Sequence, residues 1–226
     1  MGLFDGLIGY WPFDEADGNT VFDRSGNGSN GTLVGASRAD GVYGSAIFLS
    51  GNSNSHVSIA PSSILNSITS QLTVTAWAFP TSPVSGFKVI VSRQIGNLLH
   101  PDQFYLGFGP DNGTMHYKWH LGTDNNGTHL EGDIYAGTPA HNRWIHLAGV
   151  YTGQTMILYV DGAAIDQASI SGNIRVDANP ITIGAEENSA VPQNVDGEFE
   201  GFIDEVRIYN RALLASEVQA IYQMEN

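Results

Sequence analysis

Residues 104–119 read FYLGFGPDNGTMHYKW, and this stretch decides the fold class. Apolar and polar side chains alternate in Phe104–Phe108 and again in Met115–Trp119, which is typical of strands with one buried face. Between them lies Asn112-Gly113, a dipeptide that readily adopts the positive φ angles of a tight hairpin turn. The stretch therefore predicts two antiparallel strands joined by a short turn.

The same alternation recurs along most of the chain, for example in Leu72–Trp77 and Met156–Val160, with further turn signals at Asn126-Gly127 and Asp161-Gly162. Only the tail differs, because Ser216–Gln219 has the spacing of a helix-capping box ahead of apolar residues at helical intervals. The sequence thus predicts an all-β fold with one short C-terminal helix. The side chains expected to be largely buried are Trp77, Phe104, Leu106, Phe108, Tyr117, Trp119, Trp144 and Leu158.

The composition fits this fold and excludes several partners. Hydrophobic residues make up 42% of the 226 residues and charged residues only 14%, with 27 glycines, as expected for many short strands and tight turns. The net charge of -14 would repel a nucleic acid backbone or anionic lipid. The absence of cysteine excludes disulfides and thiolate sites, and no apolar segment at the N-terminus predicts membrane insertion. No linker-like run divides the chain, so we expect residues 1–226 to form a single domain.

Several segments in order along the chain resemble the laminin-G-like jelly-roll domains of the concanavalin A-like lectin/glucanase superfamily. The resemblance implies a sandwich of two antiparallel sheets in which the first and last strands are adjacent. It also implies binding to a glycan or polysaccharide, or to a cell-surface or matrix protein, as an accessory domain of a larger secreted, extracellular protein. The segments that carry it are Gly9–Glu15, Val21–Gly28, Gly41–Phe48, Leu72–Trp77, Trp144–Val150, Leu158–Gly162 and Gly201–Asn210.

Residues 23–31, which overlap the second of these segments, form a loop rich in oxygen ligands and suggest a calcium site. Ca²⁺ takes six to eight oxygen ligands in proteins, and the resemblance places this loop near the last strand. We therefore expect a structural Ca²⁺ ion shared between the two ends of the chain. The alternative is an Asx-turn loop whose side chains bond to their own backbone. The expected ligands are Asp23, Ser25, Asn27, Asn30 and Asp204.

A candidate ligand surface is formed by the polar residues that alternate with the buried ones in the central strands. If Phe104–Phe108, Met115–Leu121 and Leu130–Ile134 pair as successive hairpins, these residues share one face of the sheet. The alternative is an ordinary solvated face, and the long loops 96–102 and 184–197 are a second candidate surface. The expected ligand-binding residues are Arg93, Tyr105, His116, Lys118, His120, His129 and Glu131.

Catalysis is not expected from the sequence. Retaining glycosidases need two carboxylates about 5 to 5.5 Å apart, and Glu198 and Glu200 have a suitable spacing but no further acidic partner. Asp204 and Glu205 should point to opposite faces of their strand, and no serine lies in a nucleophile elbow. The sequence therefore predicts a non-catalytic, lectin-like carbohydrate-binding module. The alternatives are a protein-interaction or adhesion domain and a glycoside-active enzyme.

Overall fold

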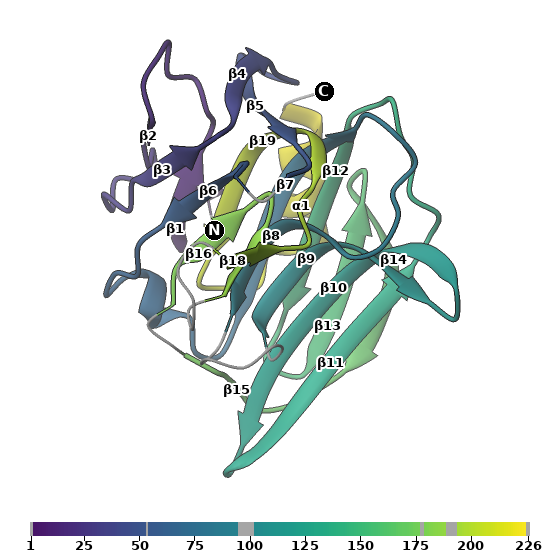
Figure 1. The fold of residues 1–226 in the computed structure, drawn as a ribbon. Coiled ribbons are helices and arrows are strands. Elements are labelled where there is room, and N and C mark those ends of the chain that lie inside the picture. The colour runs from purple at the N-terminus through teal and green to yellow at the C-terminus, as the bar shows by residue number, and fades with distance from the viewer. Residues whose placement is uncertain (1, 53, 95–101, 177–178, 189–193, 225–226) are drawn as a thin grey trace.

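The computed structural model describes residues 2–52, 54–94, 102–176, 179–188 and 194–224. In these residues two antiparallel sheets pack face to face, and the helix α1 (Ala215–Met224) lies on the outer face of one of them (Figure 1). The predicted all-β sandwich with a C-terminal helix is confirmed. No helix in the described residues has the length and apolar character required to cross a membrane.

The first sheet has eight strands. They are β1 (Leu7–Trp11), β4 (Ser37–Asp40), β5 (Ser45–Ser50), β7 (Leu72–Pro80), β12 (Ile145–Tyr151), β13 (Thr155–Val160), β14 (Ala163–Ser169) and β19 (Glu200–Tyr209). Their order is β14-β13-β12-β7-β19-β5-β4, so β19, from the C-terminal part of the chain, lies inside the sheet between β7 and β5. In addition, β1 pairs with β19. The expected adjacency of the first and last strands is therefore confirmed.

The second sheet has nine strands in the order β11-β10-β9-β8-β16-β6-β3-β2, with β15 paired to β10. They are β2 (Thr20–Val21), β3 (Gly31–Val34), β6 (His56–Ile59), β8 (Lys88–Gln94), β9 (Asp102–Asp111), β10 (Thr114–Asn125), β11 (Thr128–Ala136), β15 (Asn173–Ile174) and β16 (Ile181–Ile183). A separate hairpin of β17 (Glu186–Asn188) and β18 (Asn194–Asp196) and a short 3₁₀ helix, η1 (Leu65–Ser67), complete the described elements.

The hairpins predicted from the sequence form in the expected register. His120 of β10 lies opposite Tyr105 of β9 on one side and Asp133 of β11 on the other. Both residues of the Asn112-Gly113 and Asn126-Gly127 turns have positive φ, as two-residue hairpin turns with the twist of the flanking strands require. The β10–β11 hairpin is long and projects beyond the rest of the sandwich (Figure 1).

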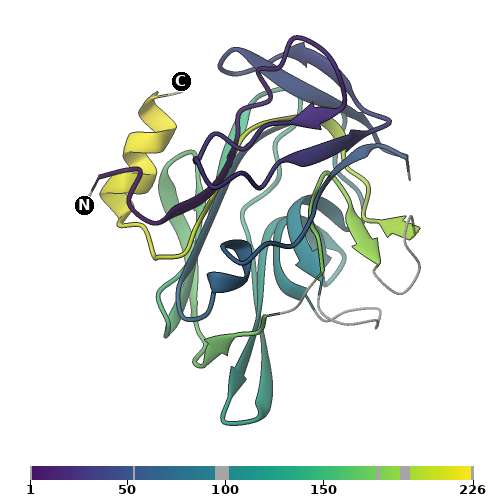
Figure 2. The ribbon, with the colours of Figure 1, turned by 90° about the vertical axis from the view of Figure 1, so that its left-hand side faces the viewer.

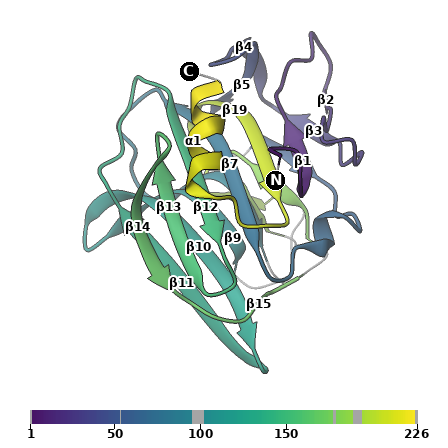
Figure 3. The same cartoon turned by 180° about the vertical axis from the view of Figure 1, so that it is seen from behind.

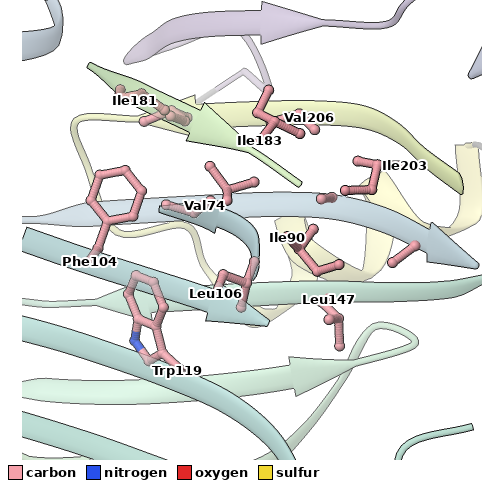
Figure 4. Packing of buried hydrophobic residues seen from close by; sticks show 14 of the residues in the cluster. Val74, Ile90, Phe104, Leu106, Trp119, Leu147, Ile181, Ile183, Ile203 and Val206 are labelled. Carbon is pink, nitrogen blue, oxygen red and sulfur yellow. The ribbon is translucent and has the colours of Figure 1, made fainter. Parts of the chain in front are cut away.

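The core lies between the two sheets and contains the apolar residues of the alternating strands (Figure 4). Trp119 of β10 is fully buried there, and its indole packs directly over Gly149 of β12 in the opposite sheet. A Cβ atom on Gly149 would lie 2.3 Å from Cδ2 of that indole. This position therefore sets how closely the two sheets approach each other.

The helix covers a second, smaller apolar cluster on the outer face of the first sheet (Figure 3). Tyr222 of α1 stacks on Trp77 of β7 with ring centroids 5.5 Å apart. The helix begins one residue before Ser216, the residue expected to cap it. Glu217 accepts the backbone N–H of Leu214 at 2.8 Å instead, which satisfies a free donor of the first turn.

One predicted core residue lies at the edge of the sandwich instead. Trp144 comes just before β12 and is only half-buried, whereas the other seven residues predicted to be buried are so. Its ring packs against Phe79 and Phe202, with centroids 5.6 and 6.3 Å away. The prediction was wrong because Trp144 precedes the first residue of β12 and packs with an aromatic group on the outer face of the first sheet.

Replacing Gly149 with alanine should destabilise the protein by about 1–3 kcal/mol, because the rigid indole of Trp119 cannot move aside in a packed core. Gly132→Ala is a matched control, since a Cβ there meets the flexible Met156 side chain, whose sulfur lies 2.5 Å away. Urea denaturation measures both variants. Equal costs for the two substitutions would contradict the proposed role of Gly149.

Candidate functional site

A cavity of about 670 Å³ lies on the outer face of the second sheet, where the sequence placed its candidate ligand surface. Its floor comes from β9, β10 and β11, and its walls come from the segment before β8 and from the β17–β18 hairpin. Figure 2 shows this hairpin on the opposite side of the sandwich from α1. The lining residues are Ser85, Gly86, Phe87, Lys88, Asp102, Tyr105, Lys118, His120, Glu131, Asp133, Glu186, Asp196 and Gly197.

His120 is held between two carboxylates of the neighbouring strand. Its Nδ1 lies 3.0 Å from Oδ1 of Asp133 and its Nε2 lies 2.9 Å from Oε2 of Glu131. Burial alone would lower the pKa of His120, but the hydrogen bonds to these carboxylates and their negative charge raise it from 6.5 to about 9. The imidazole is therefore cationic at neutral pH and fixed in orientation.

Lys118 is the second cation of the cavity, and three aromatic rings surround it. Its Nζ lies 4.7, 4.9 and 5.2 Å from the ring centroids of Phe87, Tyr105 and Tyr135. Each of these is a cation–π contact, and Oδ1 of Asp133 adds an ion pair at 3.3 Å. Its charge is thus largely compensated within the protein.

A pair of carboxyl groups closes the other side of the cavity. The pairing of β8 with β9 shifts by one residue between Phe104 and Asp102, a β-bulge that turns Asp102 toward the outer face. Burial, followed by the hydrogen bond to Glu186 and the negative charge of Glu186, raises the pKa of Asp102 from 3.8 to about 9. Asp102 is therefore protonated at neutral pH and hydrogen-bonded to Glu186.

Four of the seven predicted ligand-binding residues line this cavity, namely Tyr105, Lys118, His120 and Glu131. Tyr105 contributes its ring, because its hydroxyl donates to the carbonyl oxygen of Phe108 at 2.7 Å. The other three lie elsewhere. Arg93 differs most from the prediction, because it lies on the inner face of the sheet. It shares a face with the core residue Val91, is fully buried, and donates to the carbonyl oxygens of Asn179 and Leu65.

The other two histidines predicted to bind the ligand lie on the same sheet but outside the cavity lining. His116 packs its Nδ1 2.9 Å from the carbonyl oxygen of Gly137, and His129 lies near the tip of the projecting hairpin. His129 is mostly exposed, with its Nδ1 3.4 Å from Oδ2 of Asp124. The alternation of β10 and β11 correctly predicted that these polar residues share one face of the sheet. It did not indicate how far the cavity extends along that face.

The cavity also contains residues that the sequence did not single out, including Phe87, Lys88, Asp102 and Glu186. The loop 184–197 was considered as a separate surface, and the part of it that the structure describes forms one wall of the same cavity. Residues 96–101 and 189–193 of the two candidate loops lie outside the described residues. The acidic composition of the second loop was the available signal for Glu186.

The predicted calcium ligands lie in two separate hydrogen-bonded groups. Asp23 accepts the backbone N–H groups of Tyr10, Ser25 and Ser29 at 2.8–3.0 Å, which is the Asx-type arrangement considered as the alternative. Asn30 accepts the N–H of Asp23, and the side chain of Asn27 donates to the Ser25 hydroxyl and the Leu7 carbonyl. These contacts tie the loop to itself and to β1.

Asp204 bonds to a different loop. Its Oδ2 accepts the backbone N–H groups of Val42 and Tyr43, and its Oδ1 accepts that of Glu205. Burial raises its pKa to about 8. N–H donors present positive partial charge where a cation would lie, and no group of three His, Asp or Glu side chains in the described residues could hold a metal ion. These residues as placed do not fit a shared ion, and calcium binding stays a prediction.

Residues 50–219 match the family described as the Concanavalin A-like lectin/glucanases superfamily. Among solved structures, the chain is similar to domain 4 of AbnA, a GH43 extracellular arabinanase from Geobacillus stearothermophilus, in complex with arabinotriose. The TM-score is 0.67 with 22% identity, and the match covers 96% of this chain and 98% of that domain. No curated protein sequence matches this chain.

Two toxin binding domains have the same fold. The binding domain of Paraclostridial Mosquitocidal Protein 1 matches with a TM-score of 0.70 and 22% identity over 99% of this chain and 53% of that one. The binding domain of Botulinum Neurotoxin DC in complex with SialylT matches with a TM-score of 0.71 and 15% identity over 100% and 53%. The chain thus spans about half the length of these toxin domains.

Chelation tests the calcium prediction. If an ion bridges the Asp23 loop and Asp204, EDTA should lower Tm, because a ligand bound only by the folded state stabilises it. Asp204→Asn should then abolish the response to added Ca²⁺. Thermal melting with EDTA and with excess Ca²⁺ measures both effects. Unchanged melting would leave the Asx-type hydrogen bonds of Asp23 as the full explanation of the loop.

The free energy of unfolding should fall as pH rises from 6.5 to about 9, because the raised pKa of His120 makes the folded state hold a proton that the unfolded state has lost. Its stabilisation is complete below 6.5 and lost as pH rises through about 9. The raised pKa of Asp102 acts in the same direction up to about 9. Urea denaturation across this range measures the slope.

His120→Asn should reduce this slope, whereas His129→Asn should leave it unchanged because His129 is mostly exposed. Stability that stays constant or rises between pH 6.5 and about 9 would contradict the ion-pair assignment of His120.

Proposed function

Because the chain belongs to the Concanavalin A-like lectin/glucanases superfamily, we propose that it is a non-catalytic carbohydrate-binding module of a secreted protein. The observation that carries the proposal is the cavity on the outer face of the second sheet, which combines aromatic rings with fixed polar groups. Such combinations suit saccharides, whose C–H faces pack on rings while their hydroxyl groups form hydrogen bonds.

Phe87 is the aromatic group best placed to meet a ligand. It lines the cavity with 46% of its surface exposed, so a ligand in the cavity can reach its ring. Tyr105 is buried and forms part of the floor. An exposed ring above a buried polar floor supports a shallow site, for which micromolar to millimolar affinity is expected, or about -8 to -4 kcal/mol.

Two similar structures support a sugar ligand through what they contain. The arabinanase domain is in complex with arabinotriose, and it matches this chain over nearly its whole length. A botulinum neurotoxin binding domain is in complex with SialylT. The extracellular arabinanase and the toxins also support the proposal of a secreted parent protein.

The alternatives give different results in the same assays. A protein-interaction or adhesion domain would bind a purified cell-surface or matrix protein and leave glycan arrays blank. A glycoside-active enzyme would shorten its polysaccharide over time, which an assay of new reducing ends detects. We propose that reducing ends do not increase.

Phe87→Ala should weaken glycan binding about three- to tenfold, the range expected for loss of one aromatic contact. Phe22→Ala is the matched control, because Phe22 is similarly exposed, at 42%, and lies outside the cavity lining. Binding is measured by isothermal titration calorimetry with the saccharide that gives the strongest array signal. Equal affinity of the two variants would place the binding site elsewhere.

A further inference from the structure

The basic side chains in the centre of the cavity already have acidic or aromatic partners within the protein. His120 lies between Glu131 and Asp133, at 2.9 and 3.0 Å. Lys118 pairs with the same Asp133 at 3.3 Å and is surrounded by three rings. An anionic ligand group would have to displace these carboxylates before it could pair with either cation, at the cost of leaving them unpaired.

The carboxyl oxygens on the other side of the cavity still have hydrogen-bonding capacity. Asp102 and Glu186 are each 5% exposed and line the cavity. Oδ1 of Asp102 and Oε1 of Glu186 receive no N–H or O–H from other described residues, and a hydrogen bond joins the two side chains. Buried polar atoms without such donors are costly unless a ligand or water supplies them.

The overall charge of the cavity is negative, like that of the whole chain. Five carboxyl groups and three basic side chains line it. With Asp102 protonated at neutral pH, four other carboxyl groups face three basic side chains, and the chain as a whole carries -14. The negative charge of the cavity would repel an anionic ligand, and charges in a partly desolvated site interact more strongly than in water.

We infer that the saccharide bound in this cavity is uncharged, that its hydroxyl groups donate hydrogen bonds to Asp102 and Glu186, and that sugars bearing carboxylate groups are excluded. This inference rests on the proposed carbohydrate-binding function and names the class of sugar. It follows from the supply of free acceptors and from the internal pairing of His120 and Lys118, two of the three basic side chains of the cavity. Hydrogen bonds to charged acceptors are also stronger than those to neutral ones.

A matched panel of trisaccharides tests the inference on the full chain. The uncharged probes are arabinotriose, galactotriose and maltotriose, and the acidic probes are trigalacturonic acid and sialyllactose. At least one uncharged probe should bind at least about tenfold more tightly than both acidic ones, equivalent to about 1.4 kcal/mol. Equal or tighter binding of an acidic probe would overturn the inference but leave carbohydrate binding intact. No binding by any sugar on a full array would overturn the proposed function itself.

Glu186→Gln tests whether the carboxyl pair causes the discrimination. The substitution keeps the size of the side chain and removes its charge, so binding of the uncharged probe should weaken about tenfold while the preference over acidic probes narrows. Asp40→Asn is the control, since it removes one exposed acidic charge on β4 in the other sheet. An unchanged preference in Glu186→Gln, with Tm unchanged, would contradict this role of the pair.

Salt dependence gives a second readout that needs no substitution. Repulsion of an acidic sugar should weaken when ionic strength rises from ~0.02 M to ~0.5 M, because the Debye length shortens. Affinity for trigalacturonic acid should therefore rise relative to that for the uncharged probe. A relative fall with salt would show attraction to the cavity and overturn the inference.

Discussion

The contact between Trp119 and Gly149 is the constraint on which the rest of the sandwich depends. The indole from one sheet fills the space that the missing side chain leaves in the other, so the sheets can meet only with β10 in this register. Successive side chains of a strand point to opposite faces, and a slip by one residue would exchange the faces of β10. The burial of Trp119 thus fixes Lys118 and His120 on the outer face, in the cavity.

The cavity depends on a departure from regular structure as much as on the sheet. Without the bulge beside Phe104, Asp102 would point to the same side as the core residues, where an unpaired carboxyl group would be very costly. The bulge places it opposite Glu186 of the β17–β18 hairpin. Burial and Glu186 raise the pKa of Asp102 at this position, and the nearby cations His120 and Lys118 partly oppose that rise.

The regular part of this arrangement could be predicted from the sequence, and the irregular part could not. Period-two alternation and Asn-Gly turns were sufficient to place Tyr105, Lys118 and His120 on one face. They could not place Asp102, because one extra residue inverts the alternation, or Glu186, which reaches the site from a distant part of the chain. Arg93 was assigned to the ligand surface although regular alternation with Val91 of the core places it on the inner face. The predicted calcium ligands were grouped by the composition of the loop and by the family resemblance, whereas backbone N–H groups bond to the carboxylate oxygens of Asp23 and Asp204.

The described chain begins and ends on the same side of the sandwich, beside α1. Arg211 donates to the carbonyl oxygens of Gly2 and Asp5 and forms a paired contact with Glu217 at the start of α1. Both ends consequently leave the sandwich beside the helix, whereas the β17–β18 hairpin lies on the opposite side (Figure 2). Any segment joined at either end would be tethered on the side of the sandwich where α1 lies, away from the β17–β18 hairpin that forms one wall of the cavity.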